Sequence, residues 1–115
     1  MQVLAHPDDF VPTYTQLKAN EQKNKAMLGA IKNVKRQLEI SNQPLGAHHK
    51  RDAIPKYYIV KYGLQSLYHF DMPGGHRLMY TVRTSPSEGK EALFLELLSH
   101  DAYNKRFGYF KKKSH

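Results

Sequence analysis

Three side chains in the second half of the chain have the chemistry needed to hold and cleave a phosphodiester. An arginine offers a forked cation that matches phosphate oxygens, a histidine exchanges protons near neutral pH, and a tyrosine can position a nucleophile or stack on a base. Arg77 is the first of these, and His100 and Tyr103 follow it by about two strand lengths. They occur in the segments Gly75-His76-Arg77-Leu78-Met79-Tyr80-Thr81-Val82 and Ser99-His100-Asp101-Ala102-Tyr103-Asn104-Lys105-Arg106.

The charge of the chain suits a polyanionic partner. Its 115 residues include 18 lysines and arginines against 10 acids, a net charge of +8. Such an excess raises the affinity for phosphate backbones through counterion release, which favours RNA. A solvated tail explains the terminal lysines equally well. The cations expected to contact RNA lie in two groups: Lys50 and Arg51 in mid-chain, and Lys105, Arg106, Lys111 and Lys112 near the end.

Composition excludes several classes of protein. The chain has no cysteine, so zinc ribbons, iron–sulfur centres and thiol nucleophiles are ruled out. It contains no Asp/Glu cluster typical of a metal-dependent nuclease, and we expect neither a metal nor a cofactor. No apolar stretch approaches the length of about 18 residues that a membrane span needs, which favours a cytoplasmic protein without membrane contact. The length fits a single domain over residues 1–115 with a basic C-terminal tail.

The first half of the chain predicts a strand and two helices. Residues 1–5 fit a short strand, and Phe10, Tyr14 and Leu17 recur at helical spacing up to an interruption at Asn20. A clearer apolar stripe follows over residues 27–38. We interpret the two helices as a hairpin. Residues 42–56 are expected to form a loop, and residues 57–61 have no clear preference.

The second half predicts three strands and a short helix. Alternating residues 67–72 and 76–82 flank the turn Pro73-Gly74-Gly75, and an apolar strand covers 92–98 after a turn near Ser87. A helix from His100 should end at Gly108. The predicted class is α+β, with the N-terminal helical hairpin packed on a small antiparallel β-sheet.

The turn positions also predict the strand register. Arg77 should face Asp71 across the first turn and Leu97 across the second. Leu78, Tyr80 and Val82 then share the face that the helices cover. Arg77, Met79 and Thr81 share the other face, which we expect to be open.

These motifs resemble the RelE/ParE superfamily, the toxins of type II toxin–antitoxin systems. The resemblance spans about residues 55–109 and rests on three elements: Leu67-Tyr68-x-Phe70, the strand Gly75-His76-Arg77-Leu78-x-Tyr80-x-Val82, and Ser99-His100-x-x-Tyr103-x-Lys105-Arg106. It implies a RelE-like fold and a metal-independent mRNA interferase that cuts mRNA on the ribosome through attack by a 2′-hydroxyl. It further implies that Arg77 holds the phosphate, that His100 and Tyr103 assist, and that a small antitoxin protein binds the chain.

Two positions depart from the family and keep other functions open. RelE-type enzymes carry lysines on the strand before the arginine, where this chain has His69 and Asp71. An acid there favours a ParE-like gyrase inhibitor or a catalytically decayed RNA- or ribosome-binding protein. A basic ribosome-associated protein outside toxin–antitoxin systems is a further alternative. In the simplest alternative for single residues, Arg77 only pairs with Asp71, His100 caps a strand or helix end, and Tyr103 covers the sheet edge.

Overall fold

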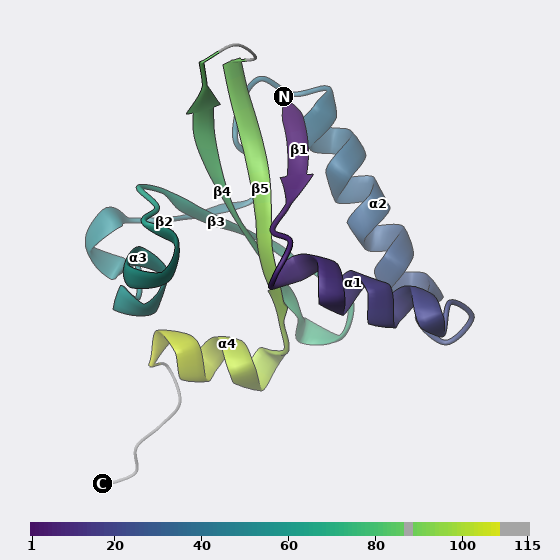
Figure 1. The fold of residues 1–115 in the computed structure, drawn as a ribbon. Coiled ribbons are helices and arrows are strands. Elements are labelled where there is room, and N and C mark those ends of the chain that lie inside the picture. Colours follow the sequence, from purple (N-terminus) through teal and green to yellow (C-terminus); the bar gives the residue numbers. More distant parts are fainter. Residues whose placement is uncertain (87–88, 109–115) are drawn as a thin grey trace, which may run out of the picture.

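A five-stranded mixed sheet forms the centre of the molecule in the computed structural model, which describes residues 1–86 and 89–108 (Figure 1). The strand order is β1-β5-β4-β3-β2, and β1 runs parallel to β5 while the other pairs are antiparallel. The α+β class is confirmed, but the expectation of an all-antiparallel sheet is wrong. The chain leaves β1 through two helices instead of a tight turn, so parallel pairing with a later strand becomes possible. The strands are Gln2–Ala5 (β1), Ala47–His49 (β2), Leu67–Asp71 (β3), Arg77–Ser85 (β4) and Gly89–Leu98 (β5).

Helices α1 (Phe10–Ala19) and α2 (Lys25–Glu39) cover one face of the sheet, called the first face here. The apolar stripe predicted for α2 is buried there, with Ile31, Val34 and Leu38 packed against side chains of β4 and β5. The two helices diverge from each other in Figure 1, and a groove separates them. None of the helices in the described part of the chain combines the length and apolar content that a membrane crossing requires.

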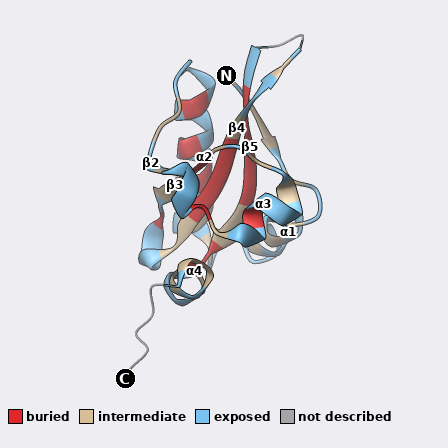
Figure 2. Cartoon of the chain, turned by 90° about the vertical axis from the view of Figure 1, so that its left-hand side faces the viewer, coloured by how far each residue is buried: buried red, intermediate tan, exposed pale blue. Residues whose placement is uncertain are grey.

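The opposite face, called the second face, is also covered. Met79 is fully buried and Thr81 is 5% exposed, so the expectation of an open face is wrong. Two later helices cover this face, α3 (Lys56–Tyr62) and α4 (His100–Phe107). The buried rings of Tyr58 on α3 and Tyr103 on α4 pack against it. Figure 2 shows the resulting buried band along β4 and β5. Helix α4 ends at Gly108 as predicted, where a φ of 72° favours glycine.

The register around Arg77 is close to the prediction. Arg77 pairs with Asp71 as expected, but it faces Leu98 instead of Leu97. The β4–β5 pairing follows the predicted register from Ser85 to Tyr80 and then shifts by one residue between Tyr80 and Met79. This is a β-bulge with one extra residue in β5, and it places Glu96 on the second face beside the preceding side chain, Leu95.

Candidate functional site

Arg77 and His100 both lie next to Gly75, at the end of the sheet where β3 passes into β4. The short 3-10 turn Pro73–Gly75 lies between these strands. The Nη1 atom of Arg77 donates to the carbonyl oxygen of Gly75 at 2.8 Å. A Cβ atom on Gly75 would lie 3.4 Å from the Cβ of His100, the first residue of α4. Gly75 also has a φ of 76°, which glycine adopts without strain, so the turn allows both segments to approach it.

The guanidinium of Arg77 is held on three sides. Its Nε lies 3.1 Å from Oδ1 of Asp71, and its Cζ lies 4.9 Å from the centre of the Tyr103 ring. Nη1 is engaged by the carbonyl group of Gly75. Within the described part of the chain, Nη2 has no hydrogen-bond partner, and the side chain is 22% exposed. Arg77 is therefore a fixed cation with one donor group available to an anion.

Two histidines extend this arrangement on the second face. His69 lies with Nε2 at 3.3 Å from Asp71 Oδ1 and with Nδ1 at 2.8 Å from Nε2 of His49. The carboxylate can only accept, so His69 carries its hydrogen on Nε2 and accepts from His49 through Nδ1. The chain His49–His69–Asp71 thus ends on the same carboxylate oxygen that holds Arg77. The network therefore connects the two histidines to Asp71 and, through its carboxylate, to the guanidinium of Arg77.

These two histidines are neutral at pH 7. Burial, with smaller effects of His69 and His48, lowers the pKa of His49 to about 4. Burial also lowers the pKa of His69, while the charge of Asp71 opposes that shift in part. Asp71 and Arg77 are therefore the charged members of the network, and they largely compensate each other at close range.

The sequence analysis did not assign a role to His49. Residues 47–49 were expected in a loop, and instead they form β2 at the sheet edge, beside β3. A strand of three residues has no readable periodicity, so nothing in the sequence predicted this neighbour. The position of His69 could have been predicted. It lies two residues before Asp71 on the predicted strand, and therefore on the same face as Asp71 and its partner Arg77.

Tyr103 is buried beneath Arg77 at 7% exposure. Its ring contacts His69 edge to face, with centroids 5.4 Å apart, and Phe107 with centroids 4.6 Å apart. The ring therefore has little free surface for stacking on a nucleotide base. Its position suits a supporting role, in which the aromatic face stabilises the cation of Arg77.

His100 is exposed at the start of α4, where Ser99 caps the helix by accepting from the backbone N–H of Ala102 at 3.1 Å. Its Nε2 lies 3.1 Å from the side-chain nitrogen of Asn104, one turn further along the helix. The ring is thus accessible to a ligand and oriented by its own helix. The cap is Ser99, so His100 is not needed to cap the helix.

The predicted RNA contacts differ in their availability. Lys50, Arg51 and Lys105 are exposed. Arg106 forms a close ion pair with Glu96 and stacks on Tyr57, with Cζ 3.9 Å from the ring centre. Its guanidinium therefore joins α4 to the sheet and to α3, and its role is structural. Lys111 and Lys112 lie outside the described residues.

The side chains of the site do not form a metal-binding group. Across residues 1–86 and 89–108, no three His, Cys, Asp or Glu side chains gather closely enough to hold a metal ion. His49 and His69 instead use ring nitrogens to bond each other. The chemistry available at the site is that of Arg77 as a cation and of His100 as a proton acceptor.

Comparisons with known proteins add no relative. No family model matches the chain, and no curated protein or solved structure is significantly similar to it.

Proposed function

We propose that the protein is a RelE-like toxin of the RelE/ParE superfamily, an endoribonuclease that cleaves mRNA on the ribosome, in the cytoplasm, without a metal ion. The observation that carries the proposal is that Arg77 and His100 both lie next to Gly75. One residue supplies an oriented cation with a free donor, and the other supplies an accessible imidazole. Both belong to a chain with a net charge of +8, which attracts RNA.

The proposed reaction is a transesterification within the RNA. In the proposed step the ring of His100 releases Asn104, so that Nε2 can take the proton from a 2′-hydroxyl. The 2′ oxygen then forms a bond to the adjacent phosphorus. The bond between phosphorus and the 5′ oxygen breaks, and that oxygen leaves with a proton from water. Negative charge develops on the phosphoryl oxygens, where Nη2 of Arg77 donates to it. The products are a 2′,3′-cyclic phosphate and a free 5′-hydroxyl.

Exposed cations beside the site support binding of the RNA backbone. Lys50 and Arg51 directly follow His49, which contacts Phe107 of α4 with ring centroids 4.8 Å apart. Lys105 is exposed on α4 itself. In the proposal these three residues bind phosphates on either side of the cleaved bond. Such contacts position the RNA without reading its sequence, and they weaken as the salt concentration rises.

The test is expression of the chain followed by mapping of the 5′ ends of cellular mRNA. We expect growth arrest with new 5′-hydroxyl ends, and a purified reaction with ribosomes that continues in EDTA. Arg77→Ala should lower the cleavage rate about a hundredfold or more, because it removes the cation that stabilises the transition state. Arg83→Ala is the matched control, since Arg83 lies on the same strand but pairs with Glu91 and is half exposed. Full cleavage by Arg77→Ala would refute the proposal.

A second function is favoured by one contact. Asp71 already neutralises part of the charge of Arg77, with Nε and Oδ1 3.1 Å apart. This suits a ParE-like inhibitor of DNA gyrase, or a decayed family member that binds RNA or the ribosome without cutting. Growth arrest with intact mRNA and trapped gyrase identifies the inhibitor. Ribosome binding without new 5′ ends identifies the decayed member.

A small antitoxin protein is the proposed partner. An acidic, partly disordered chain would fold on this basic protein and pair with cations such as Lys105. Such a partner can cover Arg77 from the sheet end, because the second face itself is filled by α3 and α4. Co-purification with the product of a neighbouring gene tests this pairing.

A further inference from the structure

A pocket opens on the second face, at the end of the sheet away from the turn before Arg77. It has a volume of 560 Å³ and lies between the end of α3, β4 and the residue that follows β1. Thr81 and Leu93 line its inner side at 5% and 9% exposure, and they pair across β4 and β5. Arg83 lies on the same strand as Arg77, six residues further on, which corresponds to about 20 Å. This pocket, called the Arg83 pocket here, is therefore separate from the candidate site around Gly75.

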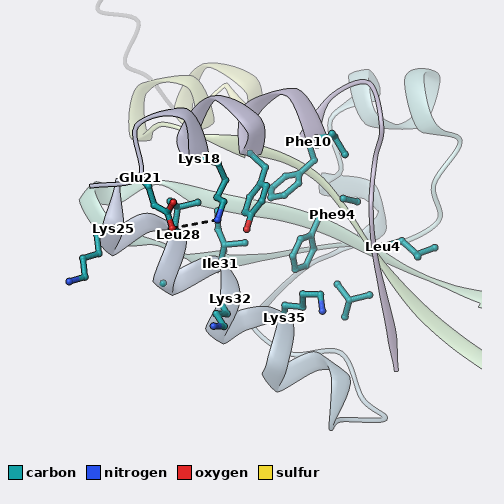
Figure 3. A pocket seen from close by; sticks show the side chains of 15 residues that line it. Leu4, Phe10, Lys18, Glu21, Lys25, Leu28, Ile31, Lys32, Lys35 and Phe94 are labelled. Atoms are coloured by element: carbon teal, nitrogen blue, oxygen red, sulfur yellow. Dashed lines mark hydrogen bonds and ion pairs between the residues drawn. The ribbon is translucent and has the colours of Figure 1, made fainter. Parts of the chain in front are cut away.

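The charged groups that line the Arg83 pocket are all basic. His6, Lys61 and Arg83 border it, and the described lining residues include no Asp or Glu. The groove between α1 and α2 is different, as Figure 3 shows, because Glu21 lies in its lining, 3.5 Å from Lys18. A pocket with basic groups alone has a positive potential, which attracts small anions.

Two of these cations are held in place and still have donors for a ligand. Nζ of Lys61 donates to Oδ1 of Asp9 and to Oη of Tyr57, each at 3.1 Å. An ammonium group has three N–H bonds, so one remains. Nε of Arg83 pairs with Glu91 at 2.6 Å, and within residues 1–86 and 89–108 no hydrogen bond engages Nη1 or Nη2. Helix α3 and strand β4 therefore each present an oriented cation with a free donor.

His6 provides a third donor, from the segment between β1 and α1. Its backbone N–H donates to the carbonyl oxygen of Phe94 at 2.8 Å, and its ring packs edge to face on Tyr62 with centroids 5.1 Å apart. Nδ1 accepts from the backbone N–H of Asp8 at 3.3 Å and lies 3.5 Å from Oδ2 of Asp9. The neutral ring therefore carries its hydrogen on Nε2, and a protonated ring carries one there too. Nε2 is a donor in both states.

We propose that the Arg83 pocket binds a nucleotide by its terminal phosphate. Phosphate oxygens accept hydrogen bonds from several directions, which suits donors that come from three separate segments of the chain. The volume of 560 Å³ lies within the range of small-molecule sites and leaves room for an organic part beside the phosphate. Binding at this pocket does not require the nuclease activity proposed above.

The rest of the lining suits a nucleobase as that organic part. Leu64 and Leu93 offer apolar surface to the flat face of a ring. Gln65 is exposed at the pocket, and its amide has both donors and an acceptor, as the edge of a base requires. A free mononucleotide and the 5′-phosphorylated end of a nucleic acid strand share this chemistry.

The first test is isothermal titration calorimetry of the full chain with adenosine 5′-monophosphate (AMP), adenosine and inorganic phosphate. We expect AMP to bind with a Kd below about 1 mM, and roughly tenfold more tightly than adenosine or phosphate alone. Absence of AMP binding would overturn the proposal. Binding of either fragment as tight as that of AMP would overturn it as well, because the pocket would then recognise only a base or only an anion.

A short DNA strand with and without a 5′-phosphate distinguishes the two sources of the nucleotide. DNA lacks the 2′-hydroxyl, so the proposed nuclease reaction cannot consume it. If the pocket binds strand ends, the phosphorylated strand should bind at least as tightly as AMP and more tightly than the unphosphorylated strand. If it binds free mononucleotides, AMP should bind more tightly than either strand.

Variants of the chain locate the binding site. Gln65→Glu places a carboxylate at the pocket without changing the size of an exposed side chain, and like charges should weaken AMP binding roughly tenfold. Circular dichroism should show an unchanged fold. The matched control is Gln16→Glu, which makes the same change on the exposed surface of α1, outside the pocket, and should preserve AMP binding. Equal weakening by both variants would mean a general charge effect and would overturn the proposal.

Two arginine variants separate the Arg83 pocket from the candidate nuclease site. Arg83→Lys keeps a cation beside Glu91 but lacks the forked donors, so AMP binding should weaken several-fold. Arg77→Ala should leave AMP binding unchanged, whatever it does to RNA cleavage. Loss of AMP binding in Arg77→Ala, with normal binding in Arg83→Lys, would place the nucleotide beside Gly75 and refute the pocket as its site.

Discussion

The two faces of the sheet bury different kinds of side chain. On the first face, the buried cluster under α1 and α2 consists of apolar and aromatic side chains, and its main polar contact joins Tyr80 Oη to the backbone of Leu45. On the second face, the carboxylate of Glu96 and the ring of His69 are largely buried among apolar residues. Each of these polar groups has a specific partner. The difference shows that the first face mainly supplies stability, while the second is adapted to hold charges in fixed places.

Glu96 illustrates what the second face requires. Its carboxylate is 13% exposed, accepts from Tyr58 Oη at 2.6 Å, and forms the close ion pair with Arg106. Burial and the bond to Glu96 raise the pKa of Tyr58, so the phenol stays protonated and keeps donating. A buried charge with two donors is tolerated, whereas a charge that loses one of them becomes costly. Mutations can therefore test whether the first face mainly supplies stability and the second face mainly holds charges.

The largest expected effect is on the first face. Leu38→Ala removes a fully buried side chain of α2, and we expect a loss of about 2–5 kcal/mol in the free energy of unfolding. Urea denaturation followed by circular dichroism measures it. Among folded molecules, the affinity for RNA should be unchanged. A loss of RNA affinity without a loss of stability would contradict the assignment of stability to this face.

The next effect is on the second face. Arg106→Ala leaves the Glu96 carboxylate with Tyr58 alone, and we expect a loss of about 1–3 kcal/mol. Combining this change with Glu96→Gln should restore part of the stability, because no uncompensated charge remains. Chemical denaturation of the two single variants and of the double variant measures the coupling. Additive losses would mean that Arg106 and Glu96 do not act as a pair.

A smaller effect concerns pH. The ordinary pKa of histidine is 6.5, and in the folded chain that of His49 is about 4. Between these values the unfolded chain takes up the proton more readily. The contribution of neutral His49 to the free energy of unfolding is therefore complete above pH 6.5 and declines as the pH falls toward 4. His69, Tyr103 and Phe107 contact this ring, and the charge of His48 also acts on it, so the control has to change His49 alone.

The control is His49→Gln, which keeps a polar side chain but cannot titrate. Melting temperatures measured at several pH values should fall less steeply for this variant than for the unmodified chain between pH 6.5 and pH 4. Carboxylates elsewhere titrate equally in both proteins. Parallel curves for the two proteins would show that His49 is not buried in neutral form.

The smallest change in stability is expected for Asp71→Asn. Asp71 is 80% exposed, and an exposed ion pair contributes less than about 1 kcal/mol. Its removal frees Nε of Arg77 for an anion, so the affinity for a short RNA should rise a few-fold in filter binding at low salt. An unchanged or weaker affinity would mean that Asp71 orients Arg77 instead of competing with the phosphate.

The sequence predicted the elements that carry long or strongly marked patterns. These include the stripe of α2, the turn that pairs Asp71 with Arg77, and the helix that ends at Gly108. It did not predict β2 and α3, which have three and seven residues. Their positions depend on partners distant in sequence, since Tyr58 of α3 bonds to Glu96 of β5. The His49–His69 pair depends on β2, and α3 supplies part of the cover of the second face, so both were missed with these elements.

The β-bulge in β5 has a consequence for the order of folding. Starting from the turn, β4 and β5 can pair in one register up to Tyr80 and Phe94. Beyond that point the same register would direct Glu96 into the apolar core of the first face, which carries a large desolvation cost. The shifted register becomes favourable only when Tyr58 and Arg106 arrive from α3 and α4. We therefore expect the strand ends that carry Arg77 and lead into His100 to complete their pairing late in folding, and native-state openings to start at this end of the sheet.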